Sequence, residues 1–187
     1  MSMTTGYTVG RHCYARYAQA AEMPNYSQRY RFRNRWRVAA PPREVYTALA
    51  RPVDYPSWWP QFREARAIDD LHYWMVVRSF LPYSIAYLLT PEIADPAAGL
   101  LQARVDGDII GRIRWQIDPG GTGSIVHFEE KVRTQIGPLT VLTPFGRLAF
   151  DANHRLMMRD GLLGLNAYLS GRSVYFGPAA RPFRHRV

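Results

Sequence analysis

Residues 150–169 limit the fold of this chain more than any other stretch, because they have the pattern of one long amphipathic helix. Asp151 is expected to cap its N-terminus and Gly171 to end it. Every segment before this helix predicts strands, loops or short helices. The helix is therefore expected to pack on a sheet, with a cavity between the two. Its apolar face is predicted to consist of Met158, Leu162, Leu165 and Leu169.

Residues 30–38 alternate strictly, which predicts a half-buried strand. Four arginines take one face, and Tyr30, Phe32, Trp36 and Val38 take the other. Asn34 is the polar exception on the apolar face. A row of arginines favours a solvent-facing or edge strand, because charge discourages edge pairing.

Two short helices are expected next, over residues 41–50 and 54–65. Pro41 and Pro42 suit the first turn of the former. The latter carries the aromatic cluster Trp58, Trp59 and Phe62. That cluster has two interpretations: a packing plug or a wall of a ligand cavity.

Six further strands are expected at residues 64–68, 72–80, 84–94, 100–105, 112–117 and 124–134. The segments between them are rich in Gly, Pro and Asp, which favour tight turns. Such short connections predict an antiparallel meander, so the first strand brings the sheet to seven. Residues 135–149 predict an apolar loop that covers something.

The 187 residues fit one domain, and their 47% of hydrophobic residues is typical of a globular protein. There is no run of about 18 apolar residues for a membrane span and no apolar N-terminal stretch for a secretory signal. A single cysteine, Cys13, excludes an internal disulfide framework and a multi-cysteine metal site. A cytoplasmic location is therefore expected.

The net charge of +9 invites a nucleic-acid hypothesis, but the charge is concentrated near the two ends. Residues 1–37 carry seven arginines against one glutamate, and residues 170–187 carry four arginines. Solvated basic tails explain this distribution better than specific nucleic-acid binding. Weak membrane contact through the tails is the alternative.

Three segments resemble the START-like, or SRPBCC, superfamily. PPREVYTAL followed by DYPSWWPQF is similar to its helix pair, VDGDIIGRIRWQIDPGGTGSIVHFEEKV to its late hairpin, and ANHRLMMRDGLLGLNAYL to the last helix of a bacterial branch. The resemblance covers residues 30–169. It implies an α+β helix-grip fold in which a seven-stranded curved antiparallel sheet wraps around the C-terminal helix. It divides the chain into an extension (1–28), a START-like domain (29–170) and a basic tail (171–187).

Glu130 is the carboxylate of greatest interest. On the last strand Val126, Phe128 and Val132 define the inward face, which places Glu130 inward and Glu129 outward. Burial in an apolar cavity raises the pKa of a carboxyl, so that it can act as a general acid or base near neutrality. The alternatives are a salt bridge to an arginine at the cavity mouth or a strand end that reaches water.

His154 and Asn153 are expected in the first turn of the long helix, where the helix dipole disfavours imidazolium. A neutral His154 is the second catalytic candidate, with fastening of the apolar loop as the alternative. Asn34 would hold a substrate carbonyl or bond to a neighbouring strand. Arg78, if inward, would pair with Glu130 or bind an anionic ligand.

The other predicted ligand-binding residues are large or adaptable side chains expected on the inner surfaces of the sheet and helices. Gly161 and Gly164 cost helix stability, which implies either a close approach to the sheet or room for a ligand. With Asn34, Arg78 and Asn153, the predicted ligand-binding set is completed by Trp36, Trp58, Trp59, Tyr87, Trp115, Phe128, Met157, Met158 and Gly161.

Members of the superfamily include polyketide cyclases and aromatases, pollen-allergen-type ligand binders and lipid-transfer domains. The resemblance thus implies a hydrophobic or aromatic small-molecule partner. A cyclase, aromatase or dehydratase activity without a cofactor is the first hypothesis, and a non-catalytic carrier of a lipid, quinone or aromatic compound is the second. No metal is expected, because the five histidines are scattered without ligand spacing. The chain is expected to be a monomer or homodimer.

Overall fold

A computed structural model of the chain describes residues 28–78, 84–134 and 144–172. The predicted N-terminal extension and almost all of the predicted basic tail lie outside these ranges. The strands are β1 (Gln28–Val38), β2 (Phe62–Ala67), β3 (Tyr73–Val77), β4 (Ile85–Asp95), β5 (Leu100–Gly107), β6 (Ile109–Gly120) and β7 (Gly123–Thr134). The helices are α2 (Pro42–Leu49), the 3-10 turn η2 (Pro52–Asp54), α3 (Tyr55–Trp58) and α4 (Pro144–Leu169).

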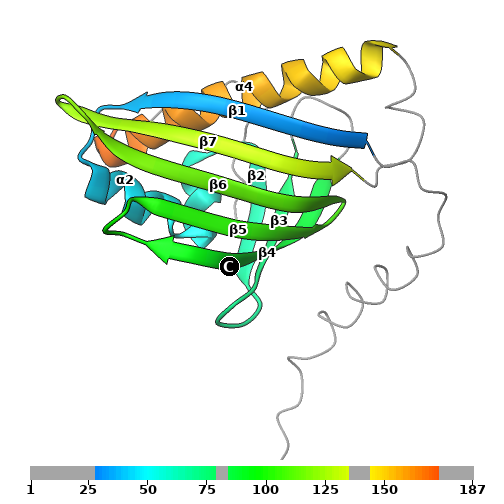
Figure 1. Cartoon of the computed structure of the whole chain (residues 1–187), viewed down its shortest axis with the longest axis horizontal. Coiled ribbons are helices and arrows are strands. Elements are labelled where there is room, and N and C mark those ends of the chain that lie inside the picture. Colours follow the sequence, from blue (N-terminus) through cyan, green and yellow to red (C-terminus); the bar gives the residue numbers. More distant parts are fainter. Residues whose placement is uncertain (1–27, 79–83, 135–143, 173–187) are drawn as a thin grey trace, which may run out of the picture.

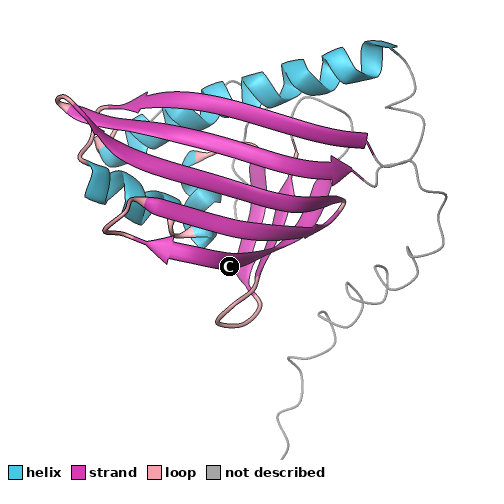
Figure 2. Ribbon diagram, viewed as in Figure 1, coloured by secondary structure: helices cyan, strands magenta, loops and turns pink. Residues whose placement is uncertain are grey.

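The strands form one seven-stranded sheet in the order β1-β7-β6-β5-β4-β3-β2, with every neighbouring pair antiparallel. The sheet is curved, and the helices lie on one side of it, with α4 running along β1 (Figures 1 and 2). This arrangement confirms the predicted meander and the predicted strand count. The period-two pattern predicted it well because each strand buries one face only.

The long helix α4 begins earlier than predicted, at Pro144 instead of residue 150. The last part of the predicted apolar loop is therefore helical, while residues 135–143 lie outside the described residues. Asp151 sits inside the helix and cannot be its N-cap. The prediction for the other end is confirmed, because Gly171 follows the helix with a positive φ of 66°.

The second predicted short helix is also shorter than expected. Residues 52–58 form only η2 and α3, and β2 already begins at Phe62. Proline in the first turn of each short element allows a helical start, and Trp59 has extended backbone angles that end α3. This break turns the chain into the far edge of the sheet.

The core lies between the concave face of the sheet and the helices. Indole rings from three elements meet there: Trp36 and Trp115 are 5.2 Å apart between ring centroids, and Trp59 lies 5.6 Å from Trp36. Asp160 of α4 is a buried carboxylate in this core. Its carboxylate accepts a hydrogen bond from Gln61 Nε2 at 2.9 Å and pairs with Arg159 at 3.0 Å.

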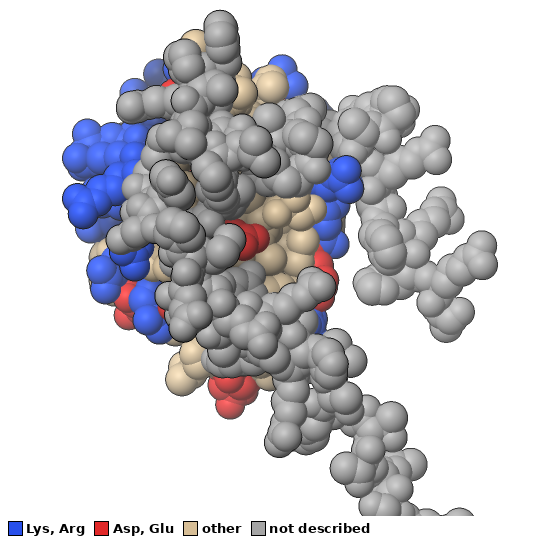
Figure 3. Space-filling view, turned by 90° about the vertical axis from the view of Figure 1, so that its right-hand side faces the viewer, with Lys and Arg blue, Asp and Glu red and all other residues tan. Residues whose placement is uncertain are grey.

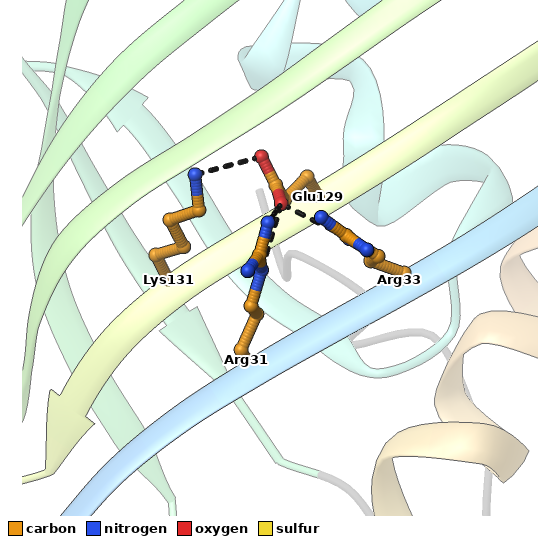
Figure 4. Close-up of polar contacts among 4 residues, drawn as sticks. All are labelled: Arg31, Arg33, Glu129 and Lys131. Carbon is orange, nitrogen blue, oxygen red and sulfur yellow. Dashed lines mark hydrogen bonds and ion pairs between the residues drawn. The ribbon is translucent and has the colours of Figure 1, made fainter.

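The outer face of the sheet is strongly basic, and Figure 3 shows Lys and Arg gathered along the corresponding side of the molecule. Arg31 and Arg33 of β1 and Lys131 of β7 converge on Glu129 at 2.6 to 3.1 Å (Figure 4). Hydrogen bonds from Arg31, then Lys131 and Arg33, lower the pKa of Glu129 to about 2. No helix in the described residues is long and apolar enough to cross a membrane.

Candidate functional site

Three polar side chains meet on the largely apolar concave face, each from a different element. Asn34 of β1 donates from Nδ2 to His154 Nε2 of α4 at 3.0 Å. The Nδ1 atom of His154 lies 3.7 Å from Oε2 of Glu130 on β7. The last distance is longer than a hydrogen bond, so Glu130 and His154 are adjacent without being bonded. We call these three residues the polar triad.

Strand register brings the triad together. Phe32 of β1 and Ile113 of β6 pair with Glu130 from either side, and Asn34 pairs with Phe128 one step along the inner face. The alternation of β7 therefore places Glu130 inward, as predicted. Its side chain keeps 12% of its exposure, so the carboxyl is largely removed from water.

Aromatic rings surround the imidazole. The ring of Phe32 stacks on His154 at a centroid distance of 3.9 Å and an interplanar angle of 14°. The ring of Phe128 lies 6.2 Å away and is also roughly parallel. These contacts, together with Phe150 packed near Phe32, fix the plane of the imidazole and exclude water from it.

Burial shifts the two titratable groups in opposite directions. Desolvation raises the pKa of Glu130 to about 7 and lowers the pKa of His154 to about 4. Both shifts favour the uncharged form, since an apolar environment disfavours charge of either sign. At pH values between these two pKa values the site is therefore mostly neutral.

The cause predicted for the neutral histidine is wrong, although its neutrality is supported. Because α4 begins at Pro144, His154 and Asn153 lie about three turns inside the helix and not in its first turn. The dipole of the helix end falls off within one turn, so it does not govern His154. Burial does.

Asn34 also sets the tautomer of His154. An amide nitrogen only donates, so Nε2 of the imidazole must accept, and the proton of the neutral ring sits on Nδ1. That N–H faces Glu130. The side chain of Asn34 therefore bonds to the histidine and not to a neighbouring strand, and its predicted contact with a substrate carbonyl stays a prediction.

The predicted aromatic wall is mainly core. Trp36, Trp58, Trp59 and Trp115 are each at most 4% exposed. The indole of Trp59 donates to the carbonyl of Met157 at 3.0 Å. For this cluster the structure favours the packing plug over the cavity wall.

Gly161 explains how α4 accommodates this plug. A Cβ atom at residue 161 would lie 2.5 Å from Cε2 of Trp59. The glycine therefore makes room for an indole of the protein, which is neither of the two reasons predicted for it. Of the two neighbouring methionines on α4, Met158 is buried, whereas Met157 is only partly buried at the margin of the core.

Two further residues of the predicted ligand-binding set, Tyr87 and Asn153, differ in how deeply they are buried. Tyr87 is buried, and burial followed by the nearby charge of Glu130 raises the pKa of its phenol. It therefore lies near the triad. Asn153 is partly exposed beside His154, and within the described residues it has an interaction partner of its own.

Arg78 does not lie where an inward ligand-binding residue would. It is exposed and follows Val77 at the end of β3, and its backbone N–H donates to the carbonyl of Gln61. Its position has the parity of Trp74 and Val76, opposite to buried Met75 and Val77. Arg78 therefore does not point inward, and the condition on which its pairing with Glu130 or with an anionic ligand depended is not met.

Three residues at the site were not singled out from the sequence: Phe32, Ile113 and Phe150. Phe32 was assigned to the inner face, but its stacking on His154 depends on how α4 crosses β1. The register partners of Glu130 would have pointed to Phe32 and Ile113, had the strand pairing been predicted residue by residue. Among the described residues, no group of three or more His, Cys, Asp or Glu side chains is placed to hold a metal ion.

Sequence comparison gives no relative: no protein family and no curated protein matches the chain. Solved structures do match its fold. The Zhui aromatase/cyclase from Streptomyces sp. R1128 aligns with a TM-score of 0.63 at 16% identity, over 80% of this chain and 99% of its own. A protein from Thermus thermophilus aligns with a TM-score of 0.61 at 18% identity, over 78% of this chain and 100% of its own.

A START superfamily protein from Mycobacterium smegmatis also aligns, with a TM-score of 0.58 at 15% identity, over 75% of this chain and 97% of its own. These likenesses show that the chain has the START-like helix-grip fold, as its sequence predicted. At such identities they carry the architecture and leave the chemistry to be argued from the site.

Proposed function

We propose that the chain binds a hydrophobic or aromatic small molecule between the concave face of the sheet and α4, and that Glu130 and His154 move protons on it. The observation that carries this proposal is the polar triad itself. A carboxyl and an imidazole lie 3.7 Å apart on an apolar face, unbonded to each other and each with a pKa shifted by burial. Such pairs of shifted groups are typical of acid–base sites.

The ligand would contact the partly exposed residues around the triad. The tryptophan cluster is filled by its own packing, so the accessible surface is provided by Phe32, Ile113, Phe150 and Met157, with Asn34 among them. Flat apolar side chains favour an aromatic ligand, and the triad would orient its polar group.

The chemistry that fits the triad is loss of water from a carbonyl compound. Ionised Glu130 takes a proton from a carbon next to a carbonyl, and the electron pair of that C–H bond forms an enolate. The enolate then expels a hydroxyl group from the neighbouring carbon as a carbon–carbon double bond forms. Protonated Glu130 returns its proton to the leaving hydroxyl, so that one water is released and Glu130 is regenerated. His154 Nδ1–H would stabilise the enolate oxygen by a hydrogen bond.

This sequence of steps corresponds to the dehydration carried out by a dehydratase or an aromatase, and one of the proteins that share the fold is an aromatase/cyclase. The proton that Glu130 takes is the proton it gives back, so the proposed reaction balances without a cofactor. A pKa of about 7 suits both halves of the cycle, because the base and the acid are present in similar amounts near neutral pH.

A non-catalytic carrier is the second candidate. The parallel rings of Phe32, His154 and Phe128 favour it, because they provide stacking without requiring a reaction. In that case Glu130 and His154 would only hydrogen-bond to a polar group of the cargo.

Proton abstraction from 5-nitrobenzisoxazole separates the two candidates. This neutral aromatic probe releases a coloured phenolate when a base removes its one acidic C–H proton. We expect the wild type and Glu129→Gln, the neighbouring outer-face control, to accelerate the release at pH 8. Glu130→Gln should lose at least tenfold of that rate. An unchanged rate in Glu130→Gln would remove the residue from its proposed role.

Native mass spectrometry of the purified chain provides the second readout. A bound small molecule without acceleration of the probe would support the carrier. Acceleration that depends on Glu130 would support the enzyme.

A further inference from the structure

The sheet sorts its charges by face. On the described positions of β1, β6 and β7 that share a face with Glu130, every other side chain is uncharged. The opposite face of the same three strands carries two carboxylates, Glu129 and Asp118. It also carries nine cationic side chains: Arg29, Arg31, Arg33, Arg35, Arg37, Arg112, Arg114, Lys131 and Arg133.

The described side chains of α4, residues 148–169, bring no cation to the site either. Arg155 and Arg159 of α4 are exposed, and Arg159 is engaged with Asp160. Arg78, which would have supplied a positive charge had it pointed inward, is exposed at the end of β3. Among the described residues the only salt-bridge contact of Glu130 is the one with His154.

An anionic ligand would therefore meet an unfavourable surface. Its charge would lose its water, gain no cationic partner from the described side chains of β1, β6, β7 and α4, and lie beside a carboxyl that is itself partly ionised near neutral pH. A neutral ligand with a hydroxyl or keto group meets no such cost. The N–H of His154 and the carboxyl of Glu130 can donate and accept hydrogen bonds to it.

We infer that the site between the sheet and α4 selects neutral ligands and rejects the carboxylate counterparts of the same size and shape. Alcohols, ketones and phenols of aromatic or aliphatic compounds are accepted, whereas fatty acids and aromatic acids are excluded. This inference rests on the proposed ligand site and specifies the class of its substrate. The selecting element is Glu130, since it is the one charged side chain on this face of the three strands.

Two matched pairs of probes test the selection by isothermal titration calorimetry at pH 8: 2-naphthalenemethanol with 2-naphthoate, and decanol with decanoate. In at least one pair we expect the neutral member to bind and the carboxylate to bind at least tenfold more weakly. Glu130→Gln should reduce the difference in affinity between the two members of the pair severalfold, because glutamine has the size of glutamate but no acidic group. Glu129→Gln, one residue away on the outer face, should leave the difference unchanged.

The possible failures are distinguishable. Equal affinity for the two members of every pair that binds, or a difference in affinity that is unchanged in Glu130→Gln, would overturn the inference and leave the ligand site standing. Absence of binding by all four probes to a folded protein would overturn the proposed site and the inference with it. Folding of each variant is checked beforehand by circular dichroism and thermal unfolding.

Discussion

At the scale of single residues, the triad depends on two groups that burial keeps uncharged by shifting their pKa values in opposite directions. The folded-state pKa of Glu130 is about 7, against an ordinary value of 4.5. Glu130 therefore gives up its proton at a lower pH in the unfolded chain than in the folded chain. As a result, the folded state becomes less stable as the pH rises from 4.5 to 7. His154 behaves in the opposite sense, because its pKa falls from 6.5 to about 4 and its stability contribution is lost as the pH falls through that window.

The two contributions nearly cancel in the wild type, so single variants should reveal them. We expect Glu130→Gln to be more stable than the wild type at pH 8 by up to about 3 kcal/mol and about equal to it at pH 4. Urea unfolding at a series of pH values measures this difference.

In His154→Gln, the stability relative to the wild type should depend on pH in the opposite direction. Its stability relative to the wild type should rise as the pH falls from 6.5 to 4. A pH-independent difference in both variants would show that the two groups keep their ordinary pKa values in the folded chain.

Residue-level reasoning from the sequence found the inner face of β7 and hence Glu130, because a period of two is a strictly local property. It also found Asn34 and His154 as separate candidates. It could not join them, since their contact spans two elements and 120 residues of sequence. It misplaced Arg78 because that strand is apolar on both faces.

At the scale of elements, α4 packs closely at Gly161 against Trp59, the residue that follows α3. We expect Gly161→Ala to destabilise the protein by about 1–3 kcal/mol, although alanine is the better helix former, because the new methyl group overpacks a buried site. Thermal or urea unfolding measures the loss.

A second change tests the cause. In a Trp59→Leu background, which removes the indole, Gly161→Ala should be neutral or stabilising. The same loss in both backgrounds would place the conflict elsewhere.

The start of α4 was predicted six residues too late. Pro144 and Gly146 have the composition of a loop, and the helix is amphipathic only in its later part. Tertiary packing over Tyr30 and Phe32 offers an apolar surface to the earlier turns, as the contact of Phe150 with both rings shows. A local pattern does not contain that information.

At the scale of the whole molecule, β1 is an edge strand of the described sheet, and it is long. Its exposed arginines are expected to oppose pairing with another copy of the chain. We predict that Arg35→Thr combined with Arg37→Thr shifts the chain toward larger species at equal concentration, as measured by size-exclusion chromatography with light scattering.

The matched control removes the same charge from strands inside the sheet. Arg104→Thr combined with Arg114→Thr alters β5 and β6, which are paired on both sides. That variant should keep the wild-type size distribution. Equal association of the two double variants would attribute the effect to net charge and not to the edge.

The fold of the whole chain could be predicted from the order of its elements: a strand, two short helical segments, six strands and a long helix. Turn residues and alternation carry that order directly. The predicted localisation, oligomeric state and membrane contact through the tails stay predictions, since they depend on partners or on residues outside the described ranges.

Glu129 and Glu130 are neighbours in the chain, yet with pKa values of about 2 and about 7 they differ by about five powers of ten in proton affinity. Because successive side chains of β7 face opposite sides of the sheet, Glu129 stays ionised at neutral pH whereas Glu130 titrates near it. Two features set which glutamate faces inward: the apolar alternation of β7, and the tight turn at Gly121, where a positive φ of 69° helps to join β6 to β7 in this register. A slip of one residue there would exchange the two acids. The turn thus helps to set the acidity of the site, because it fixes which of the two carboxyls is buried.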